Sequence, residues 1–387
     1  MPSICFSAGD PSGDAHAAHL IEALKHRLSD LRCSGLGGPA MARAGVALLD
    51  DLTQASAIGP FDAARHLGQL LHAKRLFDDH LKHHRPDLVI LVDFGDYNLP
   101  VIAPIAKRHG VPVLYYISPQ LWAWGGWRMR YVKRFVARMV VFFPFEETLY
   151  REAGVPVTWV GHPLVDTARP LRSREEAFTR FGLNPWRRTV GLLPGSRDDE
   201  VRRHLPLMLA AAKRIARHMP GAQFLLVKAP SVSEKAVAAL RALVPQAEVR
   251  IADDDVCDAL QVMEAAMVAS GTATLEAALS RVPMAVVYRG SWPTYLAAKA
   301  VVRVPHIALV NVVAGRRLVP ELIQHKATPG TLAAEIMSLL RDEERCRTVK
   351  AGLGEVKETL GAPGAIDRAA DVVIEILGPQ KTVGSRQ

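Results

Sequence analysis

The sequence contains few cysteines, and their spacing does not suit a cysteine-built site. Four cysteines occur in 387 residues, at Cys5, Cys33, Cys257 and Cys346. None stands at a redox or zinc-ligand spacing from another, so the pattern argues against a disulfide framework and predicts reduced thiols in a cytosolic protein. The sequence also lacks an apolar run long enough to span a bilayer and a basic, signal-like segment at its start.

Several catalytic signatures are missing as well. We find no Lys-bearing P-loop, no Gly-x-Ser-x-Gly elbow and no Ser-His-Asp order, so an NTPase or a triad hydrolase is unsupported. His80 and His84 have the i, i+4 spacing of a helical metal pair, but no cysteine accompanies them. The neighbouring Asp78 and Asp79 suit solvated surface charges, and we expect a packed helix without a metal.

The composition is that of an ordinary globular protein with an excess of positive charge. Apolar residues make up 49% and charged residues 22%, which is enough to bury a core in each of two domains. The net charge of +9 favours an anionic partner: nucleic acid, an acidic lipid surface or a phosphorylated substrate. Composition does not choose among these three.

Short apolar runs alternate with helical patterns along the whole chain, which predicts parallel sheets covered by helices on both faces. The runs lie at 87–93, 111–117 and 138–143, and the pattern restarts at 189–200 and continues at 222–228, 247–252, 265–271 and 283–289. We therefore expect an α/β protein of two doubly wound, Rossmann-like domains that face each other across a ligand cleft. The expected domains are 1–165 and 166–362, with a final helix at about 363–377 that is free to pack back on the first domain, and a flexible tail at 379–387.

Two turns in the first half carry carboxylates. "SAGDPSGDAHAAHL" (7–20) links a strand to a helix but holds Asp10 and Asp14 and no basic residue, so a phosphate cradle is disfavoured. Either this loop, which also holds Ser12, is not an anion site, or it handles a different part of the reaction. "VDFGDYNLP" (92–100) closes the 87–93 strand, and Asp93 or Asp96 at the sheet edge is suited to accept a proton. A helix cap or an Asx turn is the structural alternative for both.

Two turns in the second half suit anions. "LLPGSRDDE" (192–200) offers close backbone approach at Gly195 and Ser196 and a bidentate cation in Arg197. "VASGTATLEAA" (268–278) would place N–H groups and hydroxyls on a diphosphate, and Glu276 would accept hydrogen bonds from ribose hydroxyls. Ordinary strand-to-helix turns with capping residues are the alternative. The residues of the second turn are Ser270, Gly271, Thr272 and Ala273.

"SPQLWAWGGWRMRYVKRFVAR" (118–138) mixes aromatic and basic residues. Such a segment is able to stack on single-stranded nucleic acid, to anchor at a membrane interface or to hold an anionic headgroup. The alternative is that Trp122 belongs to the core and that Arg128 lies on a solvated helix face. The amphipathic helix at 63–84 presents an apolar stripe that would also rest on a membrane.

Taken together, these stretches resemble the lipid-A-disaccharide synthase family of GT-B glycosyltransferases. The resemblance rests on a collinear set in both halves: "SAGDPSGD", "GLGGPAMARAG", "DFGDYNLP", "YYISPQLWAW", "FPFEETLYREAGVPVTWVGHPLVD", "LLPGSR", "ASGTATLEAAL", "PMAVVYR" and "NVVAGRRLVPELIQ". It implies an inverting transfer from UDP-2,3-diacylglucosamine to 2,3-diacylglucosamine 1-phosphate, giving a β-1,6-linked disaccharide 1-phosphate and UDP. It also implies no metal, no cofactor, and a peripheral location on the cytoplasmic face of the inner membrane.

The resemblance also implies roles for single residues. Asp96 matches the family's general base, with Asp10 as a helper; Arg197 matches the diphosphate ligand, Glu276 the ribose ligand and Asn311 a donor-side asparagine. Asp93, Asn98, Trp122 and Arg128 fall on the acceptor side. Asp10 and Asp62 stand where the family usually has glutamate, which shortens each side chain by one methylene and indicates a reshaped acceptor pocket.

Rival functions remain open at this level. Another GT-B enzyme, either a UDP-sugar epimerase or a transferase to a different acceptor, and a non-catalytic lipid-binding paralogue both fit many of the same motifs. A nucleic-acid-binding protein leaves the motifs of the second half unexplained, so we expect no nucleic-acid partner. The expected partners are the UDP-sugar donor, the lipid-phosphate acceptor and an anionic membrane surface, and an oligomer stays open.

Overall fold

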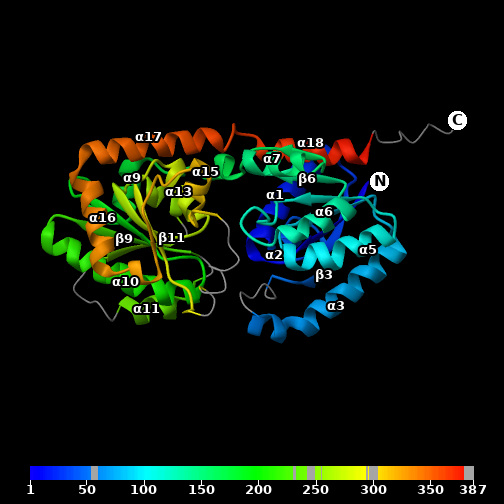
Figure 1. The fold of residues 1–387 in the computed structure, drawn as a ribbon, viewed down its shortest axis with the longest axis horizontal. Helices are drawn as coiled ribbons and strands as arrows, with labels where there is room; N and C mark the ends of the chain where they lie inside the picture. Colours follow the sequence, from blue (N-terminus) through cyan, green and yellow to red (C-terminus); the bar gives the residue numbers. More distant parts are fainter. Residues whose placement is uncertain are drawn as a thin grey trace. The chain divides into compact units, whose positions relative to one another are not determined.

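The computed structural model describes residues 1–53, 60–229, 232–241, 249–253, 255–292, 295 and 304–378 (Figure 1). Over these residues the chain forms two compact α/β units. The first comprises Met1–Pro163 and the chain from Ala362 onward, and the second runs from Leu164 to Gly361.

The first unit is built on a seven-stranded parallel sheet in the order β3-β2-β1-β4-β5-β6-β7. Its central strands are continuous apolar runs because both faces of the sheet are covered, and every residue of β4 is buried. The strands are β1 (Ser3–Ala8), β2 (Arg32–Gly37), β3 (Ala47–Asp51), β4 (Leu88–Val92), β5 (Val113–Tyr116), β6 (Arg138–Val141) and β7 (Val157–Trp159).

Helices cover both faces of this sheet. On one face α1 packs against α2 and α18; on the other, α3 packs against α5 and α5 against α6. Phe77 and Leu81 of α3 are fully buried in the core of that second face. The helices are α1 (Pro11–Arg27), α2 (Pro39–Arg43), α3 (Pro60–His84), α4 (Gly95–Tyr97), α5 (Ala103–Arg108), α6 (Met129–Phe135), α7 (Pro144–Glu152) and α18 (Ala365–Leu377), with a π-helical turn at Asn98–Ile102 and a 3-10 turn at Gly126–Arg128.

The last helix, α18, belongs to the first unit although it follows the second in sequence. Arg27 of α1 forms ion pairs with Asp367 and Asp371 of α18. Arg368 donates from its Nε to the carbonyl of Val160 at 2.8 Å. These contacts fasten the returning chain to α1 and to the end of β7.

The second unit contains a six-stranded parallel sheet in the order β10-β9-β8-β11-β12-β13. All five residues of β8 and of β11 are buried, as expected for strands covered on both faces. The strands are β8 (Thr189–Leu193), β9 (Gln223–Lys228), β10 (Val249–Asp253), β11 (Ala265–Ala269), β12 (Met284–Tyr288) and β13 (Glu321–Ile323).

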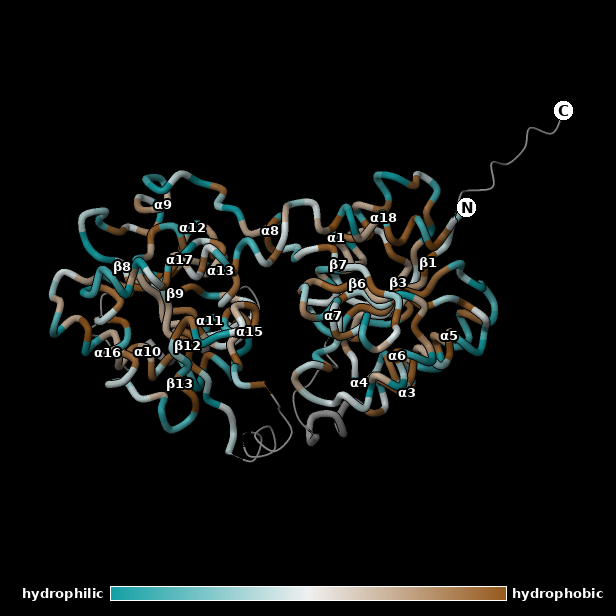
Figure 2. Tube along the Cα trace, turned by 45° about the horizontal axis from the view of Figure 1, so that its top comes forward, coloured by the Kyte–Doolittle hydropathy of each residue, from teal (hydrophilic) through white to brown (hydrophobic). Residues whose placement is uncertain are grey.

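Two helical layers enclose this sheet too. On one face α10 packs against α11 and α16, and on the other α17 packs against α13 and α15. Figure 2 shows hydrophobic segments gathered along the strands within each unit. The helices are α8 (Leu164–Thr167), α9 (Arg174–Arg180), α10 (Asp198–His218), α11 (Glu234–Arg241), α12 (Val256–Leu260), α13 (Ala273–Leu279), α15 (Leu309–Ala314), α16 (Pro329–Arg341) and α17 (Glu343–Thr359), with a 3-10 turn at Gln324–Lys326. None of the described helices combines the length and the apolar character that a membrane crossing requires.

Each sheet has a switch point where successive connections leave in opposite directions. In the first unit it lies between β1 and β4, and in the second between β8 and β11. Open α/β sheets bind ligands outside the carboxyl ends of the strands at such points. The segments after these four strands hold most of the residues singled out from the sequence; Asp62, Trp122, Arg128 and Asn311 lie elsewhere.

Candidate functional site

The loops after β1 and β4 touch each other at the first switch point. Ile4 to Ala8 pair in register with Leu88 to Val92, so Gly9 and Asp93 leave the sheet side by side. A Cβ on Gly9 would overlap the Phe94 ring, so only glycine permits this approach. The sheet thereby gathers Asp10, Asp93 and Asp96 at one edge.

The backbone of the second loop is strained at the carboxylates. Asp93 has φ 44° and Phe94 φ 47°, both in the left-handed region that L-residues seldom occupy. The carbonyl of Asp93 accepts hydrogen bonds from Tyr115 Oη at 2.5 Å and Asn98 Nδ2 at 2.9 Å. Such strain costs about 1–3 kcal/mol per residue and persists only where surrounding contacts enforce it, as these do.

Asp93 is the carboxyl group at this edge whose protonation is most strongly perturbed. Burial raises its pKa to about 7, and the nearby negative charges of Asp10 and Asp96 push in the same direction. The Phe94 N–H and the Arg128 guanidinium act against this rise. At neutral pH the Asp93 carboxyl is therefore divided between its protonated and its ionised form.

Asp96 is exposed but fixed by a buried cation. Its Oδ1 lies 2.6 Å from Arg128 Nη1, with 65% of the Asp96 side chain and 3% of the Arg128 side chain exposed. Arg128 also lies over the Trp124 ring at 4.1 Å from its centroid. The arrangement presents one carboxylate to solvent in a defined orientation.

Four further residues expected at the acceptor side differ in their surroundings. Arg128 and Asn98 are buried, and their polar atoms are engaged within the unit. Asn98 receives a hydrogen bond from Ser7 Oγ at 2.7 Å and donates to the carbonyls of Ser7, Val92 and Asp93, which joins β1 to β4. Ser12 is exposed in the first turn of α1. Asp62 lies in α3, and its side chain is outside the described residues.

The two aspartates of the opening loop differ in what they bind. Asp14 is buried and accepts hydrogen bonds from the backbone N–H groups of Gly38, Ala40 and Met41, so it fastens α1 to the start of α2. Asp10 caps α1 by accepting from Gly13 N at 2.6 Å and stays half-buried beside Asp93. Only Asp10 is therefore placed to act at the edge.

Glu146 is a buried carboxyl that sequence reasoning missed. Trp122 Nε1 donates to its Oε1 at 3.1 Å, and Phe143 N donates to its Oε2 at 3.3 Å. Burial raises the pKa of Glu146 to about 8, so it is mostly neutral at pH 7. The hydrogen bond to Glu146 therefore fixes the half-buried Trp122 ring. In the sequence, the stretch "FPFE" (143–146) is the signal that a glutamate stands at the start of the next helix.

In the second unit, the Pro194–Arg197 loop follows β8. Gly195 has φ 122°, and a Cβ there would overlap the Glu200 side chain. Glu200 accepts from Ser196 N at 3.0 Å and pairs with Arg197 at 3.3 Å, while 51% of the Arg197 side chain is exposed. The loop is thus ordered around an internal carboxylate, and Arg197 remains reachable by an external anion.

The turn after β11 is open on its outer side. Gly271 has φ 153°, and a Cβ there would meet no atom within 4 Å. Thr272 is exposed, and the N–H groups of Gly271, Thr272 and Ala273 have no acceptor among the described residues. Ser270 differs, because its hydroxyl donates to the carbonyl of Ile307 at 3.0 Å.

Glu276 lies one turn further along α13. Its side chain is half-buried and makes no hydrogen bond or ion pair with the described part of the chain. Burial raises the pKa of its carboxyl. A carboxylate in this setting is available to accept hydrogen bonds from ligand hydroxyls.

Asn311, expected on the donor side, lies inside the second unit. The residue is fully buried, and its amide donates to Val319 O and Glu321 Oε1 and accepts from the N–H groups of Leu318 and Val319. Its hydrogen-bonding capacity is used inside the unit. Asn311 therefore joins α15 to the segment before β13.

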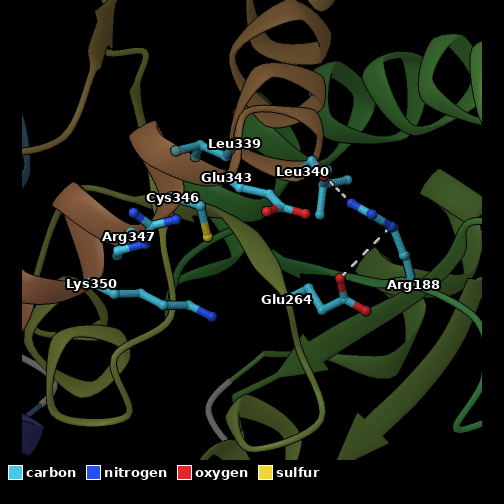
Figure 3. Close-up of a pocket in the computed structure, with 8 residues that line it drawn as sticks. All are labelled: Arg188, Glu264, Leu339, Leu340, Glu343, Cys346, Arg347 and Lys350. Atoms are coloured by element: carbon cyan, nitrogen blue, oxygen red, sulfur yellow. Dashed lines mark hydrogen bonds and ion pairs between the residues drawn. The ribbon is translucent and has the colours of Figure 1, made fainter.

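A pocket of about 370 Å³ lies in the second unit beside the amino ends of β8 and β11 (Figure 3). Arg188 reaches across it to the carbonyl of Leu340 and toward Glu264 at 3.9 Å. This is the sheet edge opposite the Pro194–Arg197 and Ser270–Ala273 turns, so the pocket is separate from them. Over the described ranges, no group of three or more His, Cys, Asp or Glu side chains is arranged to hold a metal ion.

Solved structures show the same fold at low sequence identity. S. aureus MnaA, in a co-structure with UDP, superposes with a TM-score of 0.67 at 12% identity, covering 96% of each chain. CalG4, the calicheamicin glycosyltransferase, gives 0.63 at 16%, covering 98% of this chain and 99% of that one. The expected GT-B fold is thereby confirmed.

Sequence relatives identify the family. The family model described as lipid-A-disaccharide synthetase matches residues 4–369. The lipid-A-disaccharide synthase of Geobacter sulfurreducens is 43% identical over 97% of this chain and 98% of its own length. That of Nitrosococcus oceani is 41% identical over 97% and 96%. The chain belongs to the lipid-A-disaccharide synthase family.

Proposed function

We propose that the protein transfers the 2,3-diacylglucosamine group of its UDP donor to the 6-hydroxyl of 2,3-diacylglucosamine 1-phosphate. The acceptor oxygen bonds to the anomeric carbon as the bond to UDP breaks, with inversion, and the hydroxyl proton passes to a carboxylate. The observation that carries this proposal is similarity to lipid-A-disaccharide synthases over nearly the whole chain. The two switch-point edges supply residues suited to each half of the reaction.

The second unit is proposed to hold the donor. Arg197 is exposed and suited to pair with the diphosphate, and the N–H groups of Gly271, Thr272 and Ala273, after the neighbouring strand, have no acceptor among the described residues. Glu276 is available to accept from the ribose hydroxyls. Negative charge that develops on UDP as it leaves would be stabilised by these fixed donors.

The first unit is proposed to hold the acceptor and the base. Asp96 is assigned as the base because it is exposed and oriented by Arg128. Asp93, with its pKa raised to about 7, and Asp10 set the charge of the cluster around it. A proton acceptor works best when its pKa lies close to the working pH, and at this edge the neighbouring Asp93 has a pKa of about 7.

Contact with an anionic membrane surface is proposed for the first unit. Leu67 and Leu71 of α3 are 55% and 48% exposed, and Trp127 is 58% exposed. Arg130 lies over the rings of Trp127 and Tyr131 at 5.1 and 5.0 Å from their centroids. Exposed apolar and aromatic side chains beside cations suit the boundary of an anionic bilayer, on the cytoplasmic face where the donor is available.

The reaction is tested with purified protein, the UDP-diacylglucosamine donor and the monosaccharide 1-phosphate, with the acceptor omitted in parallel. UDP release and disaccharide formation only when the acceptor is present are expected. Conversion of the UDP-sugar without acceptor would identify an epimerase. Lipid binding with no UDP release would identify a non-catalytic paralogue.

The membrane proposal is tested by co-sedimentation with vesicles of neutral or anionic lipid. Binding that rises with the anionic fraction and falls in the Trp127→Ala and Leu67→Gln/Leu71→Gln variants is expected. Trp186, which is 94% exposed in the second unit, offers a matched control as Trp186→Ala. Equal binding by all variants would remove this surface from the proposal.

A further inference from the structure

His204 lies on α10, buried at 2% exposure, one turn after Glu200. Its Nδ1 is 2.9 Å from the carbonyl oxygen of Pro194, at the start of the loop that carries Arg197. Its Nε2 is 3.0 Å from the backbone N of Arg289, the residue after β12. A single buried imidazole therefore joins two backbone segments that are far apart in the sequence.

The two partners determine the protonation state of the ring. A carbonyl oxygen only accepts, so Nδ1 carries the proton and donates to Pro194 O. A backbone N–H only donates, so Nε2 is unprotonated and accepts from Arg289 N. Burial lowers the pKa of His204, which agrees with this neutral form. The charged side chains that act on the ring are those of Glu200 and Arg203.

This bridge crosses the donor edge of the second sheet. Strands β8 and β12 each pair with β11 and not with each other, so β11 and the Ser270–Ala273 turn stand between them. Their carboxyl ends, Pro194 and Arg289, are the two groups that His204 holds. The imidazole therefore sets the spacing of the segments on either side of that turn.

The far side of the bridge is itself held firmly. Gln324, which is buried, accepts from Gly290 N at 3.0 Å and donates to Gly290 O at 3.1 Å. Arg289 also donates from Nη2 to the carbonyl of Ala327 at 2.6 Å. Arg289 and Gly290 are fixed by β12 and by the Gln324 turn. The hydrogen bonds of His204 therefore connect the Pro194–Arg197 loop to a segment whose position is fixed.

We propose that His204 is a positioning residue of the donor site, whose imidazole sets the spacing of Arg197 relative to the Ser270–Ala273 turn. The ring does not touch the donor in this scheme; it acts through the loop that carries Arg197. The inference rests on the proposed donor role of the second unit. It adds a residue of α10 that the motifs did not single out.

Two substitutions separate the bonds that His204 makes. His204→Asn keeps an amide N–H near the Nδ1 position and loses the acceptor for Arg289 N. His204→Gln keeps an acceptor near the Nε2 position and loses the donor to Pro194 O. Each variant leaves one buried backbone group unpaired, and we expect UDP to bind about 3- to 10-fold more weakly in each.

The measurements are UDP binding by calorimetry, donor KM and kcat, and the thermal midpoint. A raised UDP Kd and donor KM with kcat changed less than about twofold is expected, because the weakened contact is made to nearly the same extent in the ground state and in the transition state. His218→Asn and His218→Gln provide the matched control, since His218 is exposed on the same helix and its ring Nδ1 lies 2.9 Å from the carbonyl oxygen of Arg214. These control variants should leave UDP binding unchanged.

Each outcome separates this inference from the proposed function. Failure of the unmodified protein to bind UDP would overturn the donor role of the second unit. Normal UDP binding with unchanged Kd and KM in both folded His204 variants would overturn the role of His204 alone. A lower thermal midpoint with unchanged UDP Kd would likewise contradict a role in donor binding and would assign His204 a role in stability alone.

Discussion

The carboxyl edges of the two sheets share a topology but differ in charge. At the first edge, Asp93 lies close to Asp10 and Asp96, and the buried Arg128 pairs with Asp96. At the second edge, the exposed Arg197 pairs with Glu200, and the N–H groups of Gly271 to Ala273 and the carboxylate of Glu276 have no partner among the described residues. One edge is suited to take up a proton and the other to bind an anion.

The difference shows that the loops, and not the doubly wound frame, assign the chemistry. Both switch points open at the same place relative to their strands, and each is lined by a glycine where a Cβ would obstruct or strain the loop, at Gly9 and Gly195. The side chains that come after this glycine decide the charge: Asp10 in one case and Arg197 in the other. Fold and function are therefore separable here.

Asp96→Asn is the strongest way to break the comparison. The amide still accepts from Arg128 but no longer takes up a proton, so turnover should fall by about 10²- to 10⁴-fold, the usual contribution of a general base. UDP binding, assigned to the other edge, should be unchanged. Initial rates and calorimetry measure the two quantities; turnover near that of the unmodified protein would remove Asp96 from the base role.

Arg197→Ala tests the opposite edge. A hydrogen bond from a charged group contributes about 1.5–3 kcal/mol, so donor KM and UDP Kd should rise roughly 10- to 100-fold. Arg202→Ala is the control, because Arg202 lies in α10 just after this loop, is 63% exposed and pairs with its neighbour Asp199. An equal effect of both substitutions would mean that general charge, and not the loop, binds the donor.

Asp93→Asn sharpens the comparison through pH. The pKa of Asp93 is raised to about 7, so its carboxyl is protonated below that pH and ionised above it. In the unmodified protein we expect kcat/KM to fall as the pH is lowered below 7. In the variant we expect a flatter pH profile, with kcat/KM about tenfold lower than that of the unmodified protein at pH 8. A variant that keeps the same decline at pH 7 would assign it to another group; Asp30→Asn, at an exposed position, is the control.

Glu146→Gln has the smallest expected effect, on stability alone. The pKa of Glu146 is about 8 when folded against 4.5 as its ordinary value, so the folded protein binds more protons between these pH values. Stability from this group is present below about pH 4.5 and is lost as the pH rises through 8. Urea unfolding at pH 5.5 and 8.5 should show that the free energy of unfolding of the variant, relative to that of the unmodified protein, is higher at pH 8.5 than at pH 5.5. The same difference at both pH values would contradict the raised pKa of Glu146.

Much of the frame was predictable because its signals are local. The run at 87–93 became β4, and those at 189–200 and 265–271 contain β8 and β11 with their turns. Buried parallel strands need continuous apolar residues, and turns that approach other backbone need glycine. These requirements act over a few residues and can be read directly.

The candidate site was predictable only in part. Asp96, Arg197 and Glu276 lie at sheet edges in reachable positions, whereas Asn98 and Asn311 are buried and bonded internally. A sequence motif does not distinguish a polar residue that binds a ligand from one that hydrogen-bonds to a backbone carbonyl inside the protein. Its partners, such as Ser7 for Asn98, stand far away in the sequence.

The sequence by itself determined the two-sheet architecture, the family, and the turns in which acids and bases stand. Only the tertiary structure decided which carboxylate is buried enough to titrate near neutrality, that Asp14 closes α1 on α2, and that His204 bridges two strands. Proton affinity and hydrogen-bond pairing depend on desolvation and on partners that meet only after folding, so they are not written in any single stretch of the chain.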